Sequence, residues 1–168
     1  MAFEHRVTKY DPSFRDARGA YTRDEWTSIA DIGQRFGGTV LTREEYQRIE
    51  DAYVAVALGF MRESGQSELV AVGLENHACH PLDFEDGDVL RVEHLGDVIR
   101  RVLREEFWCR LEAPNAFVHF GYDYYMYVGV PDPCPEAARL AHELGLFVED
   151  CHSPYHLLRR ESETRPRG

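Results

Sequence analysis

The sequence predicts an α+β fold in which three or four helices pack on one side of a mostly antiparallel sheet. Apolar residues recur at helical spacing in several segments, and short runs rich in β-branched residues, bounded by turn residues, lie between them. A third observation is the aromatic-rich stretch at residues 107–130, which indicates a central hairpin. A chain of 168 residues can bury one sizeable core. We therefore expect a single domain over residues 1–158.

The two ends of the chain lack a periodic apolar pattern. Residues 1–21 are polar and contain the turn residues Asp11, Pro12 and Gly19. We expect them to form an N-terminal arm lying over the body, with a short extended piece near its start. Residues 159–168 are charged and without pattern, which indicates a frayed tail.

Four segments place apolar residues at helical spacing. The clearest opens with Thr42 and Glu45, which have the spacing of a capping box. Thr22 and Glu25 have the same spacing in front of a shorter pattern that stops at a pair of glycines. The expected helices cover residues 22–36, 42–64, 95–103 and 135–144.

Short apolar runs predict the remaining strands. Residues 68–74, with the sequence ELVAVGL, form the near-continuous apolar run that is typical of a central strand. Weaker patterns at residues 89–92 and 146–149 indicate two further short strands. Residues 76–88 form a loop in which four acidic residues are concentrated.

Within residues 107–130, the second half is expected to be one long strand whose side chains alternate between two faces. One face is apolar and belongs to the core; it would carry Val118, Phe120, Tyr122, Tyr124, Met126 and Val128. The other face mixes aromatic residues with a histidine and an acid, and would carry Phe117, His119, Asp123, Tyr125 and Tyr127. This second set suits a wet surface that binds a ligand.

The alternation also predicts the register of the hairpin. Pairing Glu112 with Phe117 puts the apolar faces of the two strands together, whereas a slip of one residue would set an apolar face beside a polar one. In this register Trp108 lies opposite Gly121, where its indole can cover backbone that has no side chain of its own.

Composition and charge exclude several functional classes. The formal net charge is −11 and the isoelectric point is near 5.1, which argues against direct binding of nucleic acid because that requires a basic surface. No apolar run is long enough to span a membrane, and the start of the chain lacks the core of a signal peptide. Four widely spaced cysteines favour reduced thiols and a cytoplasmic location.

Two kinds of site could use the histidines and cysteines. His77, Cys79 and His80 lie within four residues, and with Cys151 and His152 they could supply zinc ligands. Their spacing is not a familiar zinc motif, and we predict no metal and no cofactor. Thiol catalysis by one of these cysteines is less favoured, because adjacent strand residues point to opposite faces.

An enzymatic or small-ligand site on the hairpin is the alternative hypothesis. It would use His119, Asp123 and Tyr125 on the outer face. The histidine and the acid are four residues apart on one strand, roughly 13 Å, which is too far for a direct hydrogen bond. No nucleotide-binding, hydrolase or metalloprotease motif accompanies them, so we assign no catalytic residues.

A protein-binding surface is the leading hypothesis. Tyrosine and tryptophan are favoured interface anchors because they combine a large apolar area with a polar tip, and acidic side chains attract basic partners. The candidate partner-binding residues are Trp108, Phe117, His119, Asp123, Tyr125 and Tyr127 on the hairpin and Asp83, Glu85, Asp86 and Asp88 in the loop.

Six segments together resemble a group of small bacterial cytoplasmic proteins. They are KYDP (residues 9–12), DEWTSIADIG (24–33), LTREEYQRIEDAYV (41–54), LREEFWCRLE (103–112), HFGYDYYMYVG (119–129) and LGLFVED (144–150). The resemblance spans residues 9–155, and the group is associated with immunity proteins of polymorphic and contact-dependent toxin systems. It implies a non-catalytic antidote that occludes a cognate toxin, of the basic nuclease type. A regulatory protein-interaction module is equally compatible with these residues.

Overall fold

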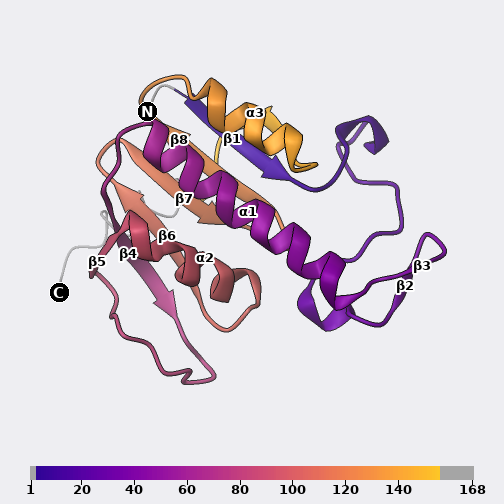
Figure 1. Ribbon diagram of the computed structural model, residues 1–168, viewed down its shortest axis with the longest axis horizontal. Coiled ribbons are helices and arrows are strands. Elements are labelled where there is room, and N and C mark those ends of the chain that lie inside the picture. Colours follow the sequence, from indigo (N-terminus) through magenta and orange to yellow (C-terminus); the bar gives the residue numbers. More distant parts are fainter. Residues whose placement is uncertain (1–2, 156–168) are drawn as a thin grey trace.

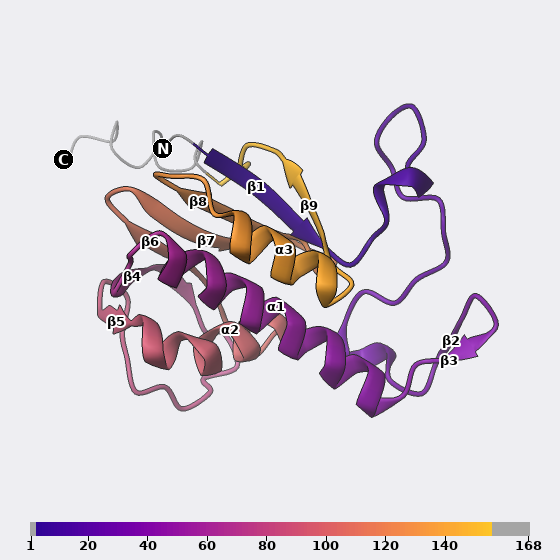
Figure 2. The same ribbon diagram turned by 45° about the horizontal axis from the view of Figure 1, so that its top comes forward.

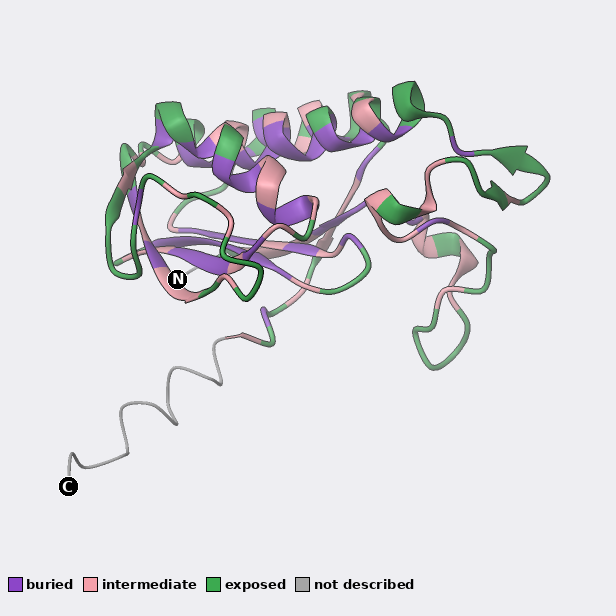
Figure 3. Cartoon of the chain, turned by 90° about the horizontal axis from the view of Figure 1, so that it is seen from below, coloured by how far each residue is buried: buried purple, intermediate pink, exposed green. Residues whose placement is uncertain are grey.

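Three α-helices cover one face of a seven-stranded antiparallel sheet in the computed structural model, which describes residues 3–155. Figures 1 and 3 show the two layers, with the helices on one side only. The buried apolar side chains form one cluster between the layers. The predicted α+β class is confirmed. The tail predicted at residues 159–168 lies outside the described residues.

The strands follow the order β5-β4-β6-β7-β8-β1-β9, and every pair of neighbours is antiparallel. The bounds are β1 Phe3–Thr8, β4 Glu68–Glu75, β5 Val89–Arg91, β6 Trp108–Ala113, β7 Ala116–Phe120, β8 Met126–Val130 and β9 Phe147–Asp150. The first strand lies inside the sheet between β8 and β9. Residues 3–8 are therefore part of the sheet and form the extended piece expected near the start of the arm, so the arm itself begins only after Thr8.

The helices are α1 Arg43–Glu63, α2 Leu95–Leu103 and α3 Pro135–Glu143. Thr42 caps α1 by accepting a hydrogen bond of 3.1 Å from the backbone N–H of Glu45. Gly65 follows the helix at φ +73°, a conformation that glycine adopts at little cost. The expected position of this helix is confirmed to within one residue at each end.

The prediction of a helix at residues 22–36 is wrong. Only a single 3₁₀ turn forms there, Ile29–Asp31, and Ser28 and Asp31 close it with a capping box. Gly33 then leaves the helical conformation at φ +91°, and Phe36 belongs to a small hairpin of β2 Arg35–Phe36 and β3 Thr39–Val40. Figure 2 shows that this hairpin and the segment after β1 extend beyond the end of the sheet.

The aromatic-rich segment forms three strands rather than two. Glu112 pairs with Phe117 as expected, but the chain turns again after Phe120 and returns as β8, with Phe120 opposite Met126. The long second strand of the sequence prediction is thus two shorter strands joined by a turn at residues 121–125. Within the described residues, no helix combines the length and apolar character needed to cross a membrane.

Candidate functional site

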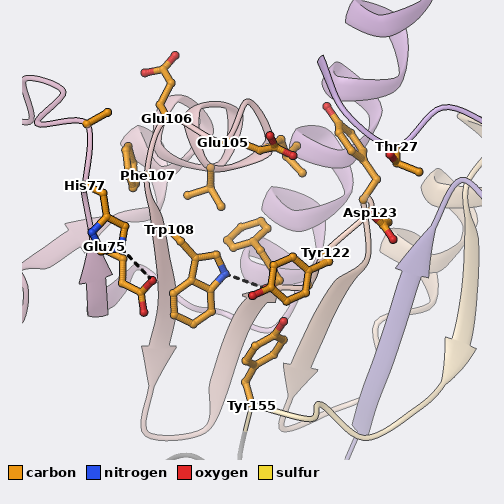
Figure 4. Close-up of a pocket in the computed structure, with 16 residues that line it drawn as sticks. Thr27, Glu75, His77, Glu105, Glu106, Phe107, Trp108, Tyr122, Asp123 and Tyr155 are labelled. Atoms are coloured by element: carbon orange, nitrogen blue, oxygen red, sulfur yellow. Dashed lines mark hydrogen bonds and ion pairs between the residues drawn. The ribbon is translucent and has the colours of Figure 1, made fainter. Parts of the chain in front are cut away.

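A pocket of about 630 Å³ opens where β6 begins and β7 ends (Figure 4). Five parts of the chain line it: the end of α2 with the residues that lead into β6, the end of β7 with residues 121–124, the end of β4 with residues 77–78, Thr27, and Tyr155. Two of the predicted partner-binding residues, Trp108 and Asp123, line it. The sequence alone gave no reason to place the other parts beside them.

The lining combines aromatic rings with carboxylates. Its acidic residues are Glu75, Glu105, Glu106 and Asp123, and among the described residues that line the pocket there is no lysine or arginine. Glu106 is paired with Arg101 at 2.7 Å. Glu105 and Asp123 form no ion pair with any other residue in the range 3–155. The pocket therefore carries negative charge that the described part of the chain does not neutralise.

Trp108 lines this pocket in a fixed orientation. Its Nε1–H donates a hydrogen bond of 3.0 Å to the carbonyl of Phe120, and its ring lies 5.5 Å from that of Tyr155. These contacts fix the indole plane. The indole thus contacts the backbone just before Gly121, whereas a β-carbon at Gly121 would meet Tyr125 and Tyr127.

A bulge in β4 places an acid beside this tryptophan. The pairing between β4 and β6 shifts between Val72 and Glu75, after which Glu75 lies opposite Trp108. Gly73 adopts φ +70° within the bulge, a conformation that side chains disfavour. His77 lies 3.6 Å from the Glu75 carboxylate and is exposed, so this contact leaves the acid open to solvent.

The turn between β7 and β8 is strained and exposes a tyrosine. Asp123 and Tyr124 have φ values of +57° and +63°, as at the two central positions of a type I′ turn, which glycine and asparagine usually occupy. The turn is closed by hydrogen bonds from Tyr125 N to the carbonyl of Tyr122 (3.2 Å) and from Gly121 N to the carbonyl of Tyr125 (2.7 Å). The side chain of Tyr122 is left 87% exposed.

Buried hydroxyl groups hold this turn in place. Tyr53 donates a hydrogen bond of 2.6 Å to the carbonyl of Tyr124, and Tyr10 donates one of 2.7 Å to the carbonyl of Asp123. The hydroxyl of Tyr124 donates to that of Tyr46 at 2.6 Å. Burial raises the pKa of each of these four tyrosines, that of Tyr46 to about 12, so all remain neutral donors. The surrounding core thus compensates for the strained backbone.

A third strained residue lies on the opposite wall of the pocket. Glu105 follows α2 at φ +61°, and its N–H bonds to the carbonyl of Val102 while that of Glu106 bonds to Arg101. This arrangement is a Schellman motif, whose left-handed position usually holds glycine. Here it presents an exposed carboxylate at the pocket.

The acidic loop lies along β4, next to the pocket. Asp86 accepts a hydrogen bond of 2.9 Å from the N–H of Leu74, and the buried ring of Phe84 packs 5.7 Å from Phe107, which lines the pocket. The carboxylates of the loop residues are exposed; they are Asp83, Glu85, Asp86 and Asp88. The bond of Asp86 to Leu74 brings the loop alongside the end of β4, where Glu75 lies.

The expectation that Phe117 and His119 lie on a wet surface is wrong. They are 1% and 0% exposed. The Phe117 ring lies over Gly129, while His119 is 2.8 Å from the hydroxyl of Ser153 and near the ring of Tyr155. The segment after β9 covers this part of the sheet, which the sequence pattern of the hairpin alone could not show.

Tyr125 and Tyr127 are only partly exposed. The Tyr125 ring packs against Tyr10 at 5.3 Å and beneath the guanidinium of Arg6 at 5.5 Å, and Tyr127 lies 6.2 Å from Tyr155. Both are largely occupied by contacts within the chain.

The prediction that Tyr122 belongs to the core is also wrong, because it assumed a single strand through residues 117–130. A signal was present in the sequence: an uninterrupted strand of that length would be longer than most, and Gly121 and Asp123 are turn-forming residues in its middle.

The histidines and cysteines are not gathered into a metal site within the described residues, where no group of three or more His, Cys, Asp or Glu side chains could hold an ion. His77 and Cys79 are exposed on the loop after β4. Cys151 and His152 lie beyond β9, where His152 is 3.4 Å from Glu4.

Comparisons with protein-family models, curated proteins and solved structures find no match for this chain.

Proposed function

We propose that this chain is a non-catalytic binding protein that neutralises a basic partner protein by covering the partner's functional surface. The observation that carries the proposal is Tyr122, whose side chain is 87% exposed on a turn fixed by buried hydroxyl groups. An aromatic anchor on a rigid turn loses little conformational entropy on binding, so its apolar contacts contribute to affinity almost undiminished.

The charge of the surface supports a basic partner. The exposed loop acids and Glu75 adjoin a pocket with two carboxylates that form no ion pair within residues 3–155, and the whole chain carries a net charge of −11. Such a field accelerates encounter with a positively charged protein and repels nucleic acid. Aromatic contacts then slow dissociation.

The class of partner follows from the same chemistry. Nucleases must bind phosphate and therefore present basic surfaces, and an acidic surface with an exposed tyrosine on a rigid turn is complementary to them. The six segments that resemble a group of bacterial proteins associated with immunity proteins point to the same class of partner. We therefore propose an immunity protein that occludes the active site or substrate channel of a cognate toxin of the nuclease type.

The geometry gives no support to catalysis on the hairpin. His119 is buried in β7 and Asp123 lies in the turn beyond it, so the two do not share the open face that the enzyme hypothesis requires. Asp123 contacts Tyr10 through its backbone carbonyl.

Native mass spectrometry tests this function on a tagged chain purified gently from its host at low salt. We expect a basic protein to copurify and to dissociate as salt is raised, and Tyr122→Ala to weaken its binding about tenfold or more. Glu68→Gln is the control: it removes one charge from an exposed acid at the far end of β4 and is expected to leave binding of the basic protein nearly unchanged.

A chain that retains a small molecule or a stoichiometric metal and no protein would contradict the proposal. A basic partner that is harmless to cells would instead assign the chain to regulatory interaction modules. Growth inhibition by the partner, relieved by coexpression of this chain, is the result expected of an antidote.

A further inference from the structure

The pocket beside Trp108 is large enough to receive part of a partner rather than merely to border it. Its volume of about 630 Å³ lies within the range of pockets that enclose a ligand, roughly 300–1,000 Å³. That space accommodates one long side chain together with some of its flanking backbone. The pocket opens next to the exposed Tyr122, so a protein contacting this tyrosine would also reach the pocket.

The walls of the pocket present flat aromatic surfaces. The rings of Trp108, Tyr122 and Tyr155 line it (Figure 4), and those of Trp108 and Tyr155 lie 5.5 Å apart. The only N–H of the indole ring is already bonded to the carbonyl of Phe120. What Trp108 offers a guest is therefore the surface of its ring, which attracts cations through its quadrupole.

The charges around these rings select the sign of the guest. Four carboxylates line the pocket, and among the described lining residues there is no lysine or arginine. Glu105 is exposed and forms no ion pair within residues 3–155. An anionic guest would be repelled here, whereas a cation would gain both ring and carboxylate contacts.

The shape of the cation follows from the flat walls. A guanidinium group is planar, stacks on aromatic faces and presents several N–H donors in its plane, where carboxylates can accept them. An ammonium group is compact and strongly hydrated, so it matches flat walls less well. On the basis of the proposed function, we infer that this pocket binds the arginine side chain of a basic protein partner, with the guanidinium against Trp108 and Tyr122 and near the Glu105 carboxylate.

The site can be tested without the partner by using N-acetyl-arginine-N-methylamide as the probe. The chain has two tryptophans. The indole N–H signal of Trp26, a buried residue that packs against Tyr124, reports on the core beside the pocket in NMR titrations. Trp108→Phe assigns the other signal. We expect the arginine probe to shift the Trp108 signal with a dissociation constant on the order of millimolar, and the shift to decrease with salt.

Two further probes separate guanidinium recognition from simpler explanations. The citrulline analogue has nearly the same shape without the charge, and we expect it to bind at least about tenfold more weakly. Equal binding of citrulline would overturn the inference in favour of an uncharged apolar pocket. Equal binding of the lysine analogue would overturn it in favour of a general cation site.

Variants of the exposed residues test the two contacts separately. Tyr122→Phe keeps the ring and is expected to bind the arginine probe as the unaltered chain does, while Tyr122→Leu keeps apolar area but is expected to weaken binding severalfold. Glu105→Gln is expected to weaken it severalfold, with Glu68→Gln as the control. Unchanged binding in both Tyr122→Leu and Glu105→Gln would overturn the inference.

The failure of this inference is distinguishable from failure of the proposed function. If a basic protein copurifies in a salt-sensitive complex but the arginine probe leaves the Trp108 signal unmoved, the anchor assigned here is wrong and the binding function stands. If the probe binds as expected and no protein partner is found, the site is supported and the antidote function is not.

Discussion

The phenyl ring of Phe117 occupies the space in which a side chain at Gly129 would begin. The two residues are directly paired across β7 and β8, and a β-carbon at residue 129 would overlap the ring. Phe117 in turn stacks on His119 with ring centroids 4.1 Å apart. The absence of a side chain at residue 129 thus permits the burial of two residues that the sequence pattern alone assigns to the surface.

Gly129→Ala should therefore destabilise the fold by about 2 to 3 kcal/mol, because overpacking forces the ring or the strand to move. Gly59→Ala is the matched control: its β-carbon would meet neighbours at 3.5 Å, an ordinary contact, and alanine favours a helix interior by roughly 0.5 to 1 kcal/mol. Urea unfolding of both variants measures the difference. Equal stability of the two would contradict the packing described here.

The hydroxyl pair beneath the turn gives an asymmetric prediction. Tyr46 accepts from Tyr124 and donates to Glu50 at 3.2 Å. Tyr46→Phe leaves a buried donor without its acceptor and should cost about 2 kcal/mol, whereas Tyr124→Phe leaves the bond to the acid intact and should cost about 1 kcal/mol. Chemical denaturation of the two variants decides the order, and the reverse order would contradict the assignment of Tyr124 as the donor and Tyr46 as the acceptor of this bond.

Glu50 is a fully buried carboxylate between two helices. Burial would raise its pKa, but hydrogen bonds from Arg104 and Arg100 more than offset this and hold the pKa of Glu50 below its usual value. Glu50→Gln should destabilise the fold by about 3 kcal/mol at neutral pH, because it removes the buried carboxylate that Arg104 and Arg100 share and leaves Arg100 with Asp51.

The acid dependence of that difference has a definite sign. Because the folded pKa of Glu50 is depressed, its stabilising contribution is present above the unfolded value of about 4.3 and is lost as pH falls through the folded pKa. The difference in the free energy of unfolding between the unaltered chain and Glu50→Gln should therefore decrease as the pH is lowered. Urea midpoints measured from neutral to acid pH would show a constant gap if the carboxylate were not involved.

Lys9 is a buried ammonium between the rings of Tyr10 and Trp26, at 4.3 and 4.0 Å, and 3.3 Å from Glu25. Burial lowers its pKa to about 8. Between this value and the unfolded value of about 10.4, the unfolded chain binds more protons, so the contribution of this residue to stability rises with pH.

Lys9→Met should consequently raise the free energy of unfolding at neutral pH by about 1 to 3 kcal/mol. It should also remove part of the increase in stability between pH 8 and about 9.5. The comparison stops there because tyrosines of the unfolded chain ionise at higher pH. Thermal or urea unfolding across this range measures both effects. A less stable variant would show that the ring and Glu25 contacts outweigh the cost of burying the charge.

Glu105 combines backbone strain with a position in the pocket. Glu105→Gly removes the steric cost of a side chain in the left-handed conformation and should raise the free energy of unfolding by roughly 0.5 to 1 kcal/mol. Because it also removes the carboxylate, it should weaken binding of the basic partner. Glu105→Ala removes the same charge but keeps the strain, so it should weaken binding without a gain in stability. A loss of stability in Glu105→Gly would contradict the strain argument.

Local patterns were sufficient for much of the fold. The capping residue Thr42 and Gly65 bound α1 because they satisfy or free backbone groups at its own ends. The pairing of Glu112 with Phe117 followed from alternation on two adjacent strands. These features depend on neighbours that are close in sequence.

The prediction of a helix at residues 22–36 was wrong because polar groups of this segment make hydrogen bonds other than those of a helix. Asp31 closes a single turn with Ser28, and the N–H of Gly33 bonds to the carbonyl of Leu41 instead of continuing a helix. The turn at residues 121–125 was likewise missed, since tyrosine is unusual at a position with positive φ unless distant groups stabilise it.

By itself, the sequence determined the fold class, the main helix, the hairpin register and the acidic charge, because periodicity and composition carry that information. Only the tertiary structure decided which aromatic residues are accessible. Hydroxyls of Tyr10 and Tyr53, far away along the chain, fix the turn that exposes Tyr122, and the segment near Ser153 buries His119. Solvent exposure depends on what distant parts of the chain cover, and a strand pattern does not encode that.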